Sequence, residues 1–146
     1  MLDMWEFATD RGLSVVEARG PHRSGYYPGE RVIRLTPGMR GRVLRSVLAH
    51  EVGHHELGHR PLAPGIERDR QEAAANRWAA SLLISPLEYA AAERLRGGHL
   101  PSIAVDLQVS DELVSVYRAQ LFRAETTVYV GPRMGLGQWD YRQEVA

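Results

Sequence analysis

Leu48-Ala49-His50-Glu51-Val52-Gly53-His54 is the stretch that decides how the rest of the chain is interpreted. It has the form His-Glu-x-x-His inside a segment of helical periodicity. Residues four positions apart lie on one face of a helix, so His50 and His54 can each direct an imidazole nitrogen at the same ion. Glu51 then stands beside that ion without binding it. This arrangement is typical of zinc-dependent hydrolases.

Apolar residues around the motif predict that it faces the interior. Wound as a helix, the segment carries an apolar stripe formed by Leu44, Val47, Leu48 and Glu51, with Val43, His50 and His54 along its edge. Buried polar groups need partners, and a divalent cation would satisfy these groups together. The alternative is a solvent-facing helix whose histidines contribute only to solubility. The apolar residues around the motif argue against it, because they leave no solvent-exposed face for the motif to occupy.

The next predicted helix, residues 69–83, offers a third ligand. Its buried face is expected at Ala75, Trp78, Ala79, Leu82 and Leu83, and Glu72 extends the same face upstream. A carboxylate on a buried face is costly unless a cation neutralises it. Glu72 is therefore the predicted third ligand. An ion pair from Glu72 to Arg45 or Arg77 is the alternative.

Three other residues compete with Glu72 for the third position. The longer metzincin pattern needs Gly at position 57 and His at position 60, where this chain has Leu57 and Arg60. His59 misses that register by one residue, so it ranks below Glu72. Glu67 projects away from the predicted buried face and Asp69 lies on its margin, so both rank lower as well.

Composition limits the classes of function. The chain has 146 residues, which fits one domain, and its 18 Lys and Arg balance 18 Asp and Glu. Charge therefore provides no argument for binding nucleic acid or an anionic membrane. The absence of cysteine excludes disulfides and thiolate metal ligands and is compatible with a reducing compartment. Neither a signal peptide nor an apolar run of about 20 residues is visible, so we expect a cytoplasmic protein.

The predicted fold class is α+β. A short helix over residues 2–10 precedes strands over residues 13–18 and 31–35, which we expect to form a small antiparallel sheet. Thr36 is predicted to cap the active-site helix, which runs to about Gly58. Ser85-Pro86-Leu87-Glu88 has the form of a capping box and predicts a helix that ends before Gly97.

The C-terminal part of the chain carries two expectations. Residues 102–120 resemble a helix-turn-helix, but the second helix would begin with Asp111 and Glu112, which repel phosphates. Two packed helices that close the core are therefore favoured over a DNA-reading element. We expect a single domain over residues 1–125 and a tail over residues 126–146, with a strand at 126–130 and a poorly ordered end.

Two segments together resemble the ImmA/IrrE family of zinc metallopeptidases. They are residues 45–54 (RSVLAHEVGH) and residues 72–83 (EAAANRWAASLL), and the resemblance extends over roughly residues 13–120. It implies a zincin-like domain with an N-terminal sheet, an active-site helix and C-terminal helices. It also implies Zn²⁺ as cofactor, His50, His54 and Glu72 as its ligands, and Glu51 as the catalytic base. The chain departs from the family at Ile84-Ser85, where Leu-Met is usual.

The resemblance also implies a biological role. Members of this family, found in phages, mobile elements and bacterial stress responses, act on a helix-turn-helix repressor and so relieve repression, which implies that this chain cleaves such a repressor. Because the long C-terminal extension of the radiation-response members is missing, a phage or mobile-element anti-repressor is expected. The alternatives are a non-catalytic zinc-containing protein that sequesters the repressor, and a DNA-binding regulator. Tyr26, Tyr27 and His99 are unranked candidates for stabilising the oxyanion.

Overall fold

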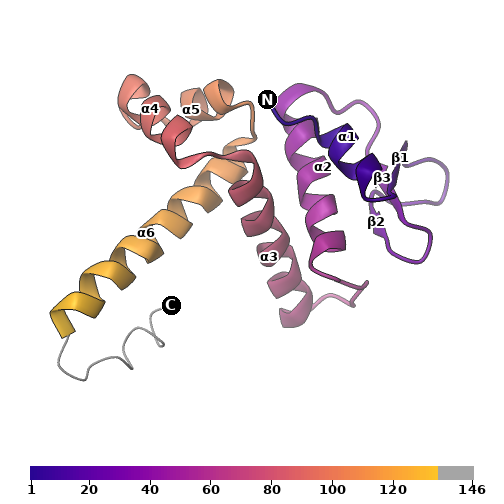
Figure 1. The fold of residues 1–146 in the computed structure, drawn as a ribbon. Helices are drawn as coiled ribbons and strands as arrows, with labels where there is room; N and C mark the ends of the chain where they lie inside the picture. Colours follow the sequence, from indigo (N-terminus) through magenta and orange to yellow (C-terminus); the bar gives the residue numbers. More distant parts are fainter. Residues whose placement is uncertain (135–146) are drawn as a thin grey trace.

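The structure is a computed structural model that describes residues 1–134, with the side chains of residues 1–124. Its elements in chain order are α1 (Met4–Asp10), β1 (Ser14–Glu17), β2 (Gly25–Tyr27), β3 (Val32–Leu35), α2 (Gly41–Glu56), α3 (Ile66–Leu83), α4 (Pro86–Arg96), α5 (Leu100–Leu107) and α6 (Asp111–Met134). Figure 1 shows α1 and the sheet on one side of α2, with α3 between α2 and α6. The predicted α+β class is confirmed.

The sheet is mixed, with the strand order β1-β3-β2. β2 pairs with β3 antiparallel, whereas β1 pairs with β3 parallel and places Ser14 opposite Val32. The expectation of a purely antiparallel sheet is therefore wrong for the two strands that were predicted. The cause is β2, because this three-residue strand lies between them in the chain and adds a second reversal of direction. Such a short strand has too few residues to show alternation.

Helix α2, which carries the His-Glu-x-x-His motif, begins later than predicted. Its first residue is Gly41 and its N-cap is Arg40, whose side chain makes no capping hydrogen bond. The prediction that Thr36 caps this helix is wrong, because Gly38 has a φ of 90° and interrupts any helix that starts at Thr36. Residues 36–40 instead form the turn that leads from β3 into α2.

The C-terminus of α2 ends in a Schellman motif at the predicted glycine. Gly58 has a φ of 68°, and its N–H donates to the carbonyl of His55 at 3.1 Å. The N–H of His59 donates to the carbonyl of His54 at 2.9 Å. This pattern is the pair of backbone hydrogen bonds that ends many helices, and it folds residue 59 back beside residue 54.

Close packing of α2 against α3 forms the centre of the core. The buried residues of α2 are Ser46, Leu48, Ala49, Val52 and Gly53, and α3 meets them with Ala75, Ala79, Ala80 and Leu83. A Cβ atom at Gly53 would lie 3.1 Å from the Ala75 carbonyl oxygen and 3.1 Å from Cε3 of Trp78. Glycine thus lets the two backbones approach closely. Val43, predicted at the edge of the stripe, is 44% exposed.

The C-terminal helices complete the core. Ser85 caps α4 as predicted, since its hydroxyl accepts a hydrogen bond from the Glu88 N–H at 3.4 Å. The predicted packing of the last two helices is confirmed by their buried residues, which are Ile103, Ala104 and Leu107 of α5 and Leu113, Val114 and Tyr117 of α6. Their connecting turn is fastened to α2, because the Ser110 N–H donates to the Ser46 hydroxyl at 2.8 Å.

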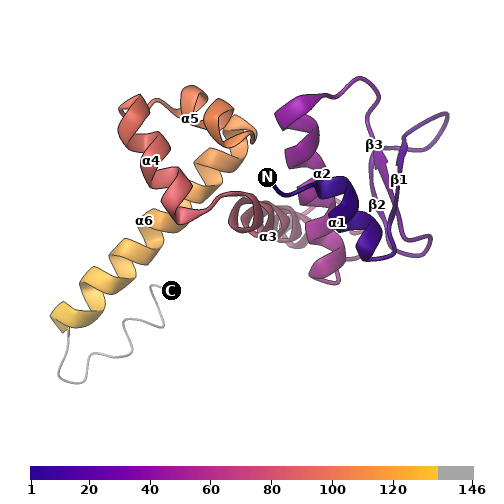
Figure 2. The same cartoon turned by 45° about the horizontal axis from the view of Figure 1, so that its top comes forward.

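The predicted strand at residues 126–130 is wrong, because α6 continues as a helix to Met134. Figure 2 shows α6 extending beyond α4 and α5. The end of the predicted tail, residues 135–146, lies outside the described residues. Among the described residues, no helix combines the length and apolar character needed to cross a bilayer.

Candidate metal centre

Three side chains from two helices converge at one point beside the α2–α3 contact. His50 and His54 come from successive turns of α2, and their Nε2 atoms lie 3.1 Å apart. Glu72 comes from α3, with one carboxylate oxygen 2.7 Å from His54 Nε2 and the other 3.5 Å from His50 Nε2. The three residues that were predicted as ligands are therefore brought together as one group with metal-ligand chemistry.

The spacing of these donor atoms fits a small divalent cation. Tetrahedral zinc, with bonds of about 2.0–2.1 Å to nitrogen and oxygen, places neighbouring ligand atoms about 3.3 Å apart. The observed separations of 2.7, 3.1 and 3.5 Å bracket that value. The donor set of two imidazoles and one carboxylate is also one that catalytic zinc sites use, and it leaves a fourth position open.

Asn76 contacts the His50 ring at Nδ1, the nitrogen that faces away from the candidate metal position. His50 Nδ1 lies 2.7 Å from Asn76 Oδ1, and Asn76 Nδ2 donates to a Glu112 carboxylate oxygen at 3.3 Å. Since the amide nitrogen faces the carboxylate, the amide oxygen faces the ring and accepts its N–H. His50 then carries its proton on Nδ1, which leaves the Nε2 lone pair directed at the candidate metal position.

His59 contacts His54 in a similar way. The two Nδ1 atoms lie 2.9 Å apart, in an arrangement that the Schellman motif at the end of α2 creates. Burial, with a further contribution from His50, lowers the pKa of His54 to about 4, so its imidazole is neutral near pH 7. His59 therefore contacts His54 through Nδ1, away from the Nε2 atom that faces Glu72. The third member of the group is Glu72 and not His59.

Glu51 lies on α2 beside the group. The pKa of its carboxyl is raised to about 6, mainly by burial and in part by the neighbouring Glu72 carboxylate, while His50 and the Tyr26 backbone N–H act to lower it. Tyr26 belongs to β2, so the small sheet contributes to the electrostatic surroundings of this carboxylate. Glu51 is thus a partly desolvated carboxylate held next to the candidate metal position.

A cleft of about 560 Å³ opens onto these residues. Its walls are residues 24–30 of β2 and the following turn, residues 59–62 after α2, and Arg68, Gln71 and Glu72 of α3. Glu51 and His54 also line it. The site is therefore open to a peptide-sized molecule and is not a closed structural metal site.

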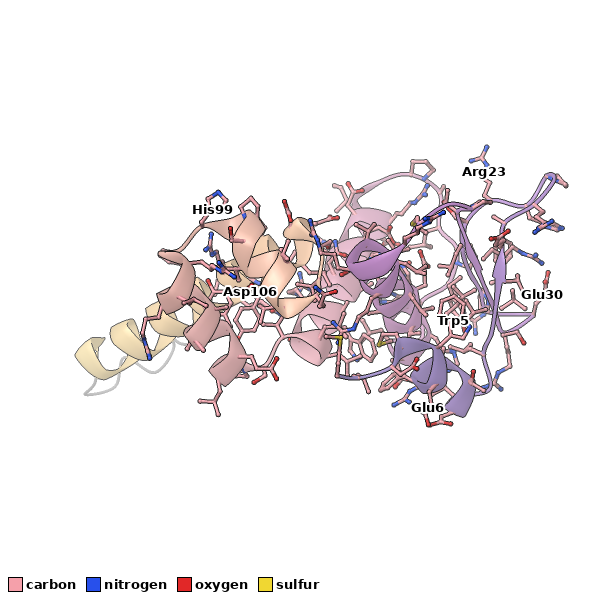
Figure 3. All side chains as sticks on the ribbon, turned by 90° about the horizontal axis from the view of Figure 1, so that it is seen from above. Trp5, Glu6, Arg23, Glu30, His99 and Asp106 are labelled. Carbon is pink, nitrogen blue, oxygen red and sulfur yellow. The ribbon has the colours of Figure 1, made fainter. Side chains whose placement is uncertain are left out.

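Two of the three residues predicted as candidates for stabilising the oxyanion lie at the cleft, and the third does not. Tyr26 and Tyr27 both line the cleft, and the Tyr26 hydroxyl is 2.8 Å from Nδ1 of His55. His99 is the N-cap of α5, and its ring accepts the Ser102 N–H. Figure 3 shows His99 on the part of the molecule formed by the C-terminal helices, well away from Glu30 of the cleft wall. His99 therefore does not belong to this site.

The family comparison agrees with this geometry. The chain matches the family model of the IrrE N-terminal-like domain, peptidase family M78, over residues 8–117. The chain belongs to this family. Its predicted membership of the ImmA/IrrE metallopeptidases is confirmed, and the M78 domain has a protein as its substrate. No curated protein and no solved structure matches the chain.

The residues around the M78 site that sequence reasoning missed are Asn76 and Glu112. Asn76 lies one helical turn after Glu72, so the same four-residue spacing that links His50 to His54 could have revealed it. Glu112 was considered only as a residue that repels DNA. The alternative partners of Glu72 are not used, since Arg45 donates to the carbonyls of Leu107 and Gln108 at 3.5 and 2.9 Å. Glu72 pairs with the two histidines instead.

Proposed function

We propose that the chain is a zinc-dependent endopeptidase in which His50, His54 and Glu72 hold the ion. The observation that carries this proposal is the convergence of two imidazoles and one carboxyl group at 2.7–3.5 Å within an open cleft. Zinc is favoured because the donor set is two imidazoles and one carboxylate, with no thiolate in the chain. Bound zinc supplies Lewis acidity, which lowers the pKa of water to about 7 and polarises a peptide carbonyl.

Glu51 is proposed as the general base. Its carboxylate lines the same cleft as His54 and Glu72 but is not part of the three-residue group. There it accepts a proton from the attacking water and returns it to the amine that leaves, so that a C–N bond is exchanged for a C–O bond.

The substrate that we propose is a helix-turn-helix repressor, whose cleavage relieves repression as in the ImmA/IrrE proteins that the two motif segments resemble. The open cleft supports an extended protein segment as the group that is bound. β2 is an edge strand of the sheet and forms part of the cleft wall. Within the described residues no further strand pairs with its outer edge, which suits a peptide in extended conformation.

Co-expression with the repressor encoded by a neighbouring gene tests this proposal. We expect fragments with the wild-type chain and none with Glu51→Gln, with the cleavage site given by the masses of the fragments. Gln is nearly isosteric with Glu, so the variant should fold and keep its zinc while activity falls by a factor on the order of 100 to 10,000. Elemental analysis of the variant serves as the control for metal content.

Sequestration is the competing function, and the same experiment separates it from cleavage. A repressor that stays intact but loses DNA binding equally with the wild type and with Glu51→Gln would show that the chain acts by binding alone. Direct DNA binding by residues 102–120 has less support, because Asp111 pairs with Arg42 at 3.0 Å and Glu112 accepts from Asn76. Both acids lie at the start of α6, where phosphates would have to approach.

A further inference from the structure

Two exposed arginines line the cleft and have no partner among the described side chains. Arg60 follows α2 and Arg68 lies in the first turns of α3, and both belong to the cleft wall. Within residues 1–124, neither guanidinium makes a hydrogen bond or an ion pair. Three carboxylates, Glu30, Glu51 and Glu72, also line the cleft, and two of them are engaged. Glu30 pairs with Arg34 at 3.0 Å, and Glu72 contacts the two histidines.

The position of these cations relative to the candidate metal centre is set by the backbone. Arg68 precedes Glu72 by four residues, so it lies on the same face of α3 about 6 Å along the helix. Arg60 directly follows His59, whose ring contacts His54. An extended peptide advances about 3.3 Å per residue, so either guanidinium is within reach of a side chain about two or three residues from the scissile bond.

From this placement we infer that the cleft selects protein segments with an acidic side chain within about three residues of the scissile bond, held by Arg60 and Arg68. This inference rests on the proposed endopeptidase function and adds its substrate class. A guanidinium binds a carboxylate through two parallel N–H donors, which a neutral amide matches poorly. Glu67 and Asp69 flank Arg68 in the chain but do not line the cleft, so they do not oppose an acidic ligand there.

Arg70 provides a matched control. It lies two residues after Arg68 on the same helix, is exposed, and makes no ion pair or hydrogen bond within residues 1–124, but it does not line the cleft. Removing its charge changes the net charge of the chain as much as removing that of Arg68. If the preference for acidic substrates changes when Arg68 is replaced but not when Arg70 is replaced, the change comes from the position of Arg68 in the cleft and not from the net charge of the chain.

The test is digestion of a peptide library of diverse sequence by the full chain loaded with zinc, with each cut read by mass spectrometry. We expect Asp and Glu to be enriched near the cuts, with kcat/KM on the order of tenfold higher than for matched Asn and Gln peptides. The double variant Arg60→Gln with Arg68→Gln should lose this enrichment, and Arg70→Gln should keep it. Arg68→Glu should shift enrichment toward Lys and Arg, a gain that misfolding cannot produce.

The outcomes separate this inference from the proposed function. Cleavage without acidic enrichment, or enrichment that survives in the double variant, would overturn the inference and leave the endopeptidase intact. If no peptide is cut, the proposed function fails, and binding of Glu and Gln peptides to the Glu51→Gln variant measures the inference separately by fluorescence anisotropy. Equal affinity for the two peptides would overturn it. Tighter binding of the Glu peptide that weakens at high ionic strength would support it.

Discussion

His50 Nδ1 lies 2.7 Å from Asn76 Oδ1, a contact between α2 and α3 that decides which nitrogen of His50 carries the proton. Glu112 accepts from the amide nitrogen of Asn76 at 3.3 Å and thereby fixes the orientation of the amide. The imidazole must then donate through Nδ1 and offers its Nε2 lone pair toward His54 and Glu72. The start of α6 is thus connected to the candidate metal centre through two hydrogen bonds.

Asn76→Ala is predicted to weaken zinc binding by about ten- to 100-fold, because His50 loses the acceptor that orients its ring. Competition against a chromophoric chelator measures the change in zinc affinity. The double variant Asn76→Asp with Glu112→Gln is the control, since a carboxylate is a common partner of metal-binding histidines and the Gln amide can donate to it where Glu112 would repel it; it should retain most of the affinity. Equal affinities for wild type and Asn76→Ala would show that this hydrogen bond does not orient the ligand.

Glu72→Ala is predicted to reduce the zinc content from about one ion per chain to a small fraction, because two imidazoles alone hold zinc weakly. Elemental analysis of protein purified under identical conditions gives the zinc content. Glu67→Ala is the control, since Glu67 lies on the same helix outside the three-residue group. Undiminished zinc in Glu72→Ala would assign the third ligand to another residue, with His59 as the next candidate.

Gly53→Ala is predicted to destabilise the fold by about 1 kcal/mol, and Gly53→Val by about 3 kcal/mol. The added Cβ would meet the Ala75 carbonyl oxygen at 3.1 Å, and a backbone atom cannot move without shifting α3. Alanine gains about 1 kcal/mol in helix propensity, which offsets only part of this cost. Urea denaturation measures the free energy of unfolding. The exposed Val43→Ala should change it by no more than about 0.5 kcal/mol.

The pH dependence of stability is predicted to include the ion pair between α4 and α5. Arg96 donates to both carboxylate oxygens of Asp106 at 2.7 and 2.8 Å, and these hydrogen bonds lower the pKa of Asp106 below its ordinary 3.8. The stabilisation is therefore present above pH 3.8 and is lost as the pH falls through the lowered value. Thermal denaturation should show Asp106→Asn less stable than wild type at pH 7, with the difference disappearing at low pH.

Local geometry explains what the sequence by itself determined about this protein. The four-residue spacing of His50 and His54 places both rings on one face of any helix that contains them. Gly58 and Ser85 marked a helix end and a helix start, because a left-handed backbone and a side-chain cap are chosen by single residues. Glu72 was also predicted, but on the argument that it extends a buried helix face; its side chain is 49% exposed in the structure, so the packing of α3 on α2 and not burial places it beside the two histidines.

Only the tertiary structure decided which distant residues meet. The contact of Asn76 with His50 joins residues 26 positions apart, and that of Glu112 with Asn76 joins residues 36 apart. Their proximity depends on how α3 packs on α2 and α6. The parallel pairing of β1 with β3 likewise depends on a short strand between them, and the start of α2 at Gly41 depends on the turn that leaves the sheet. Because these are relations between separate elements, no periodicity within one segment encodes them.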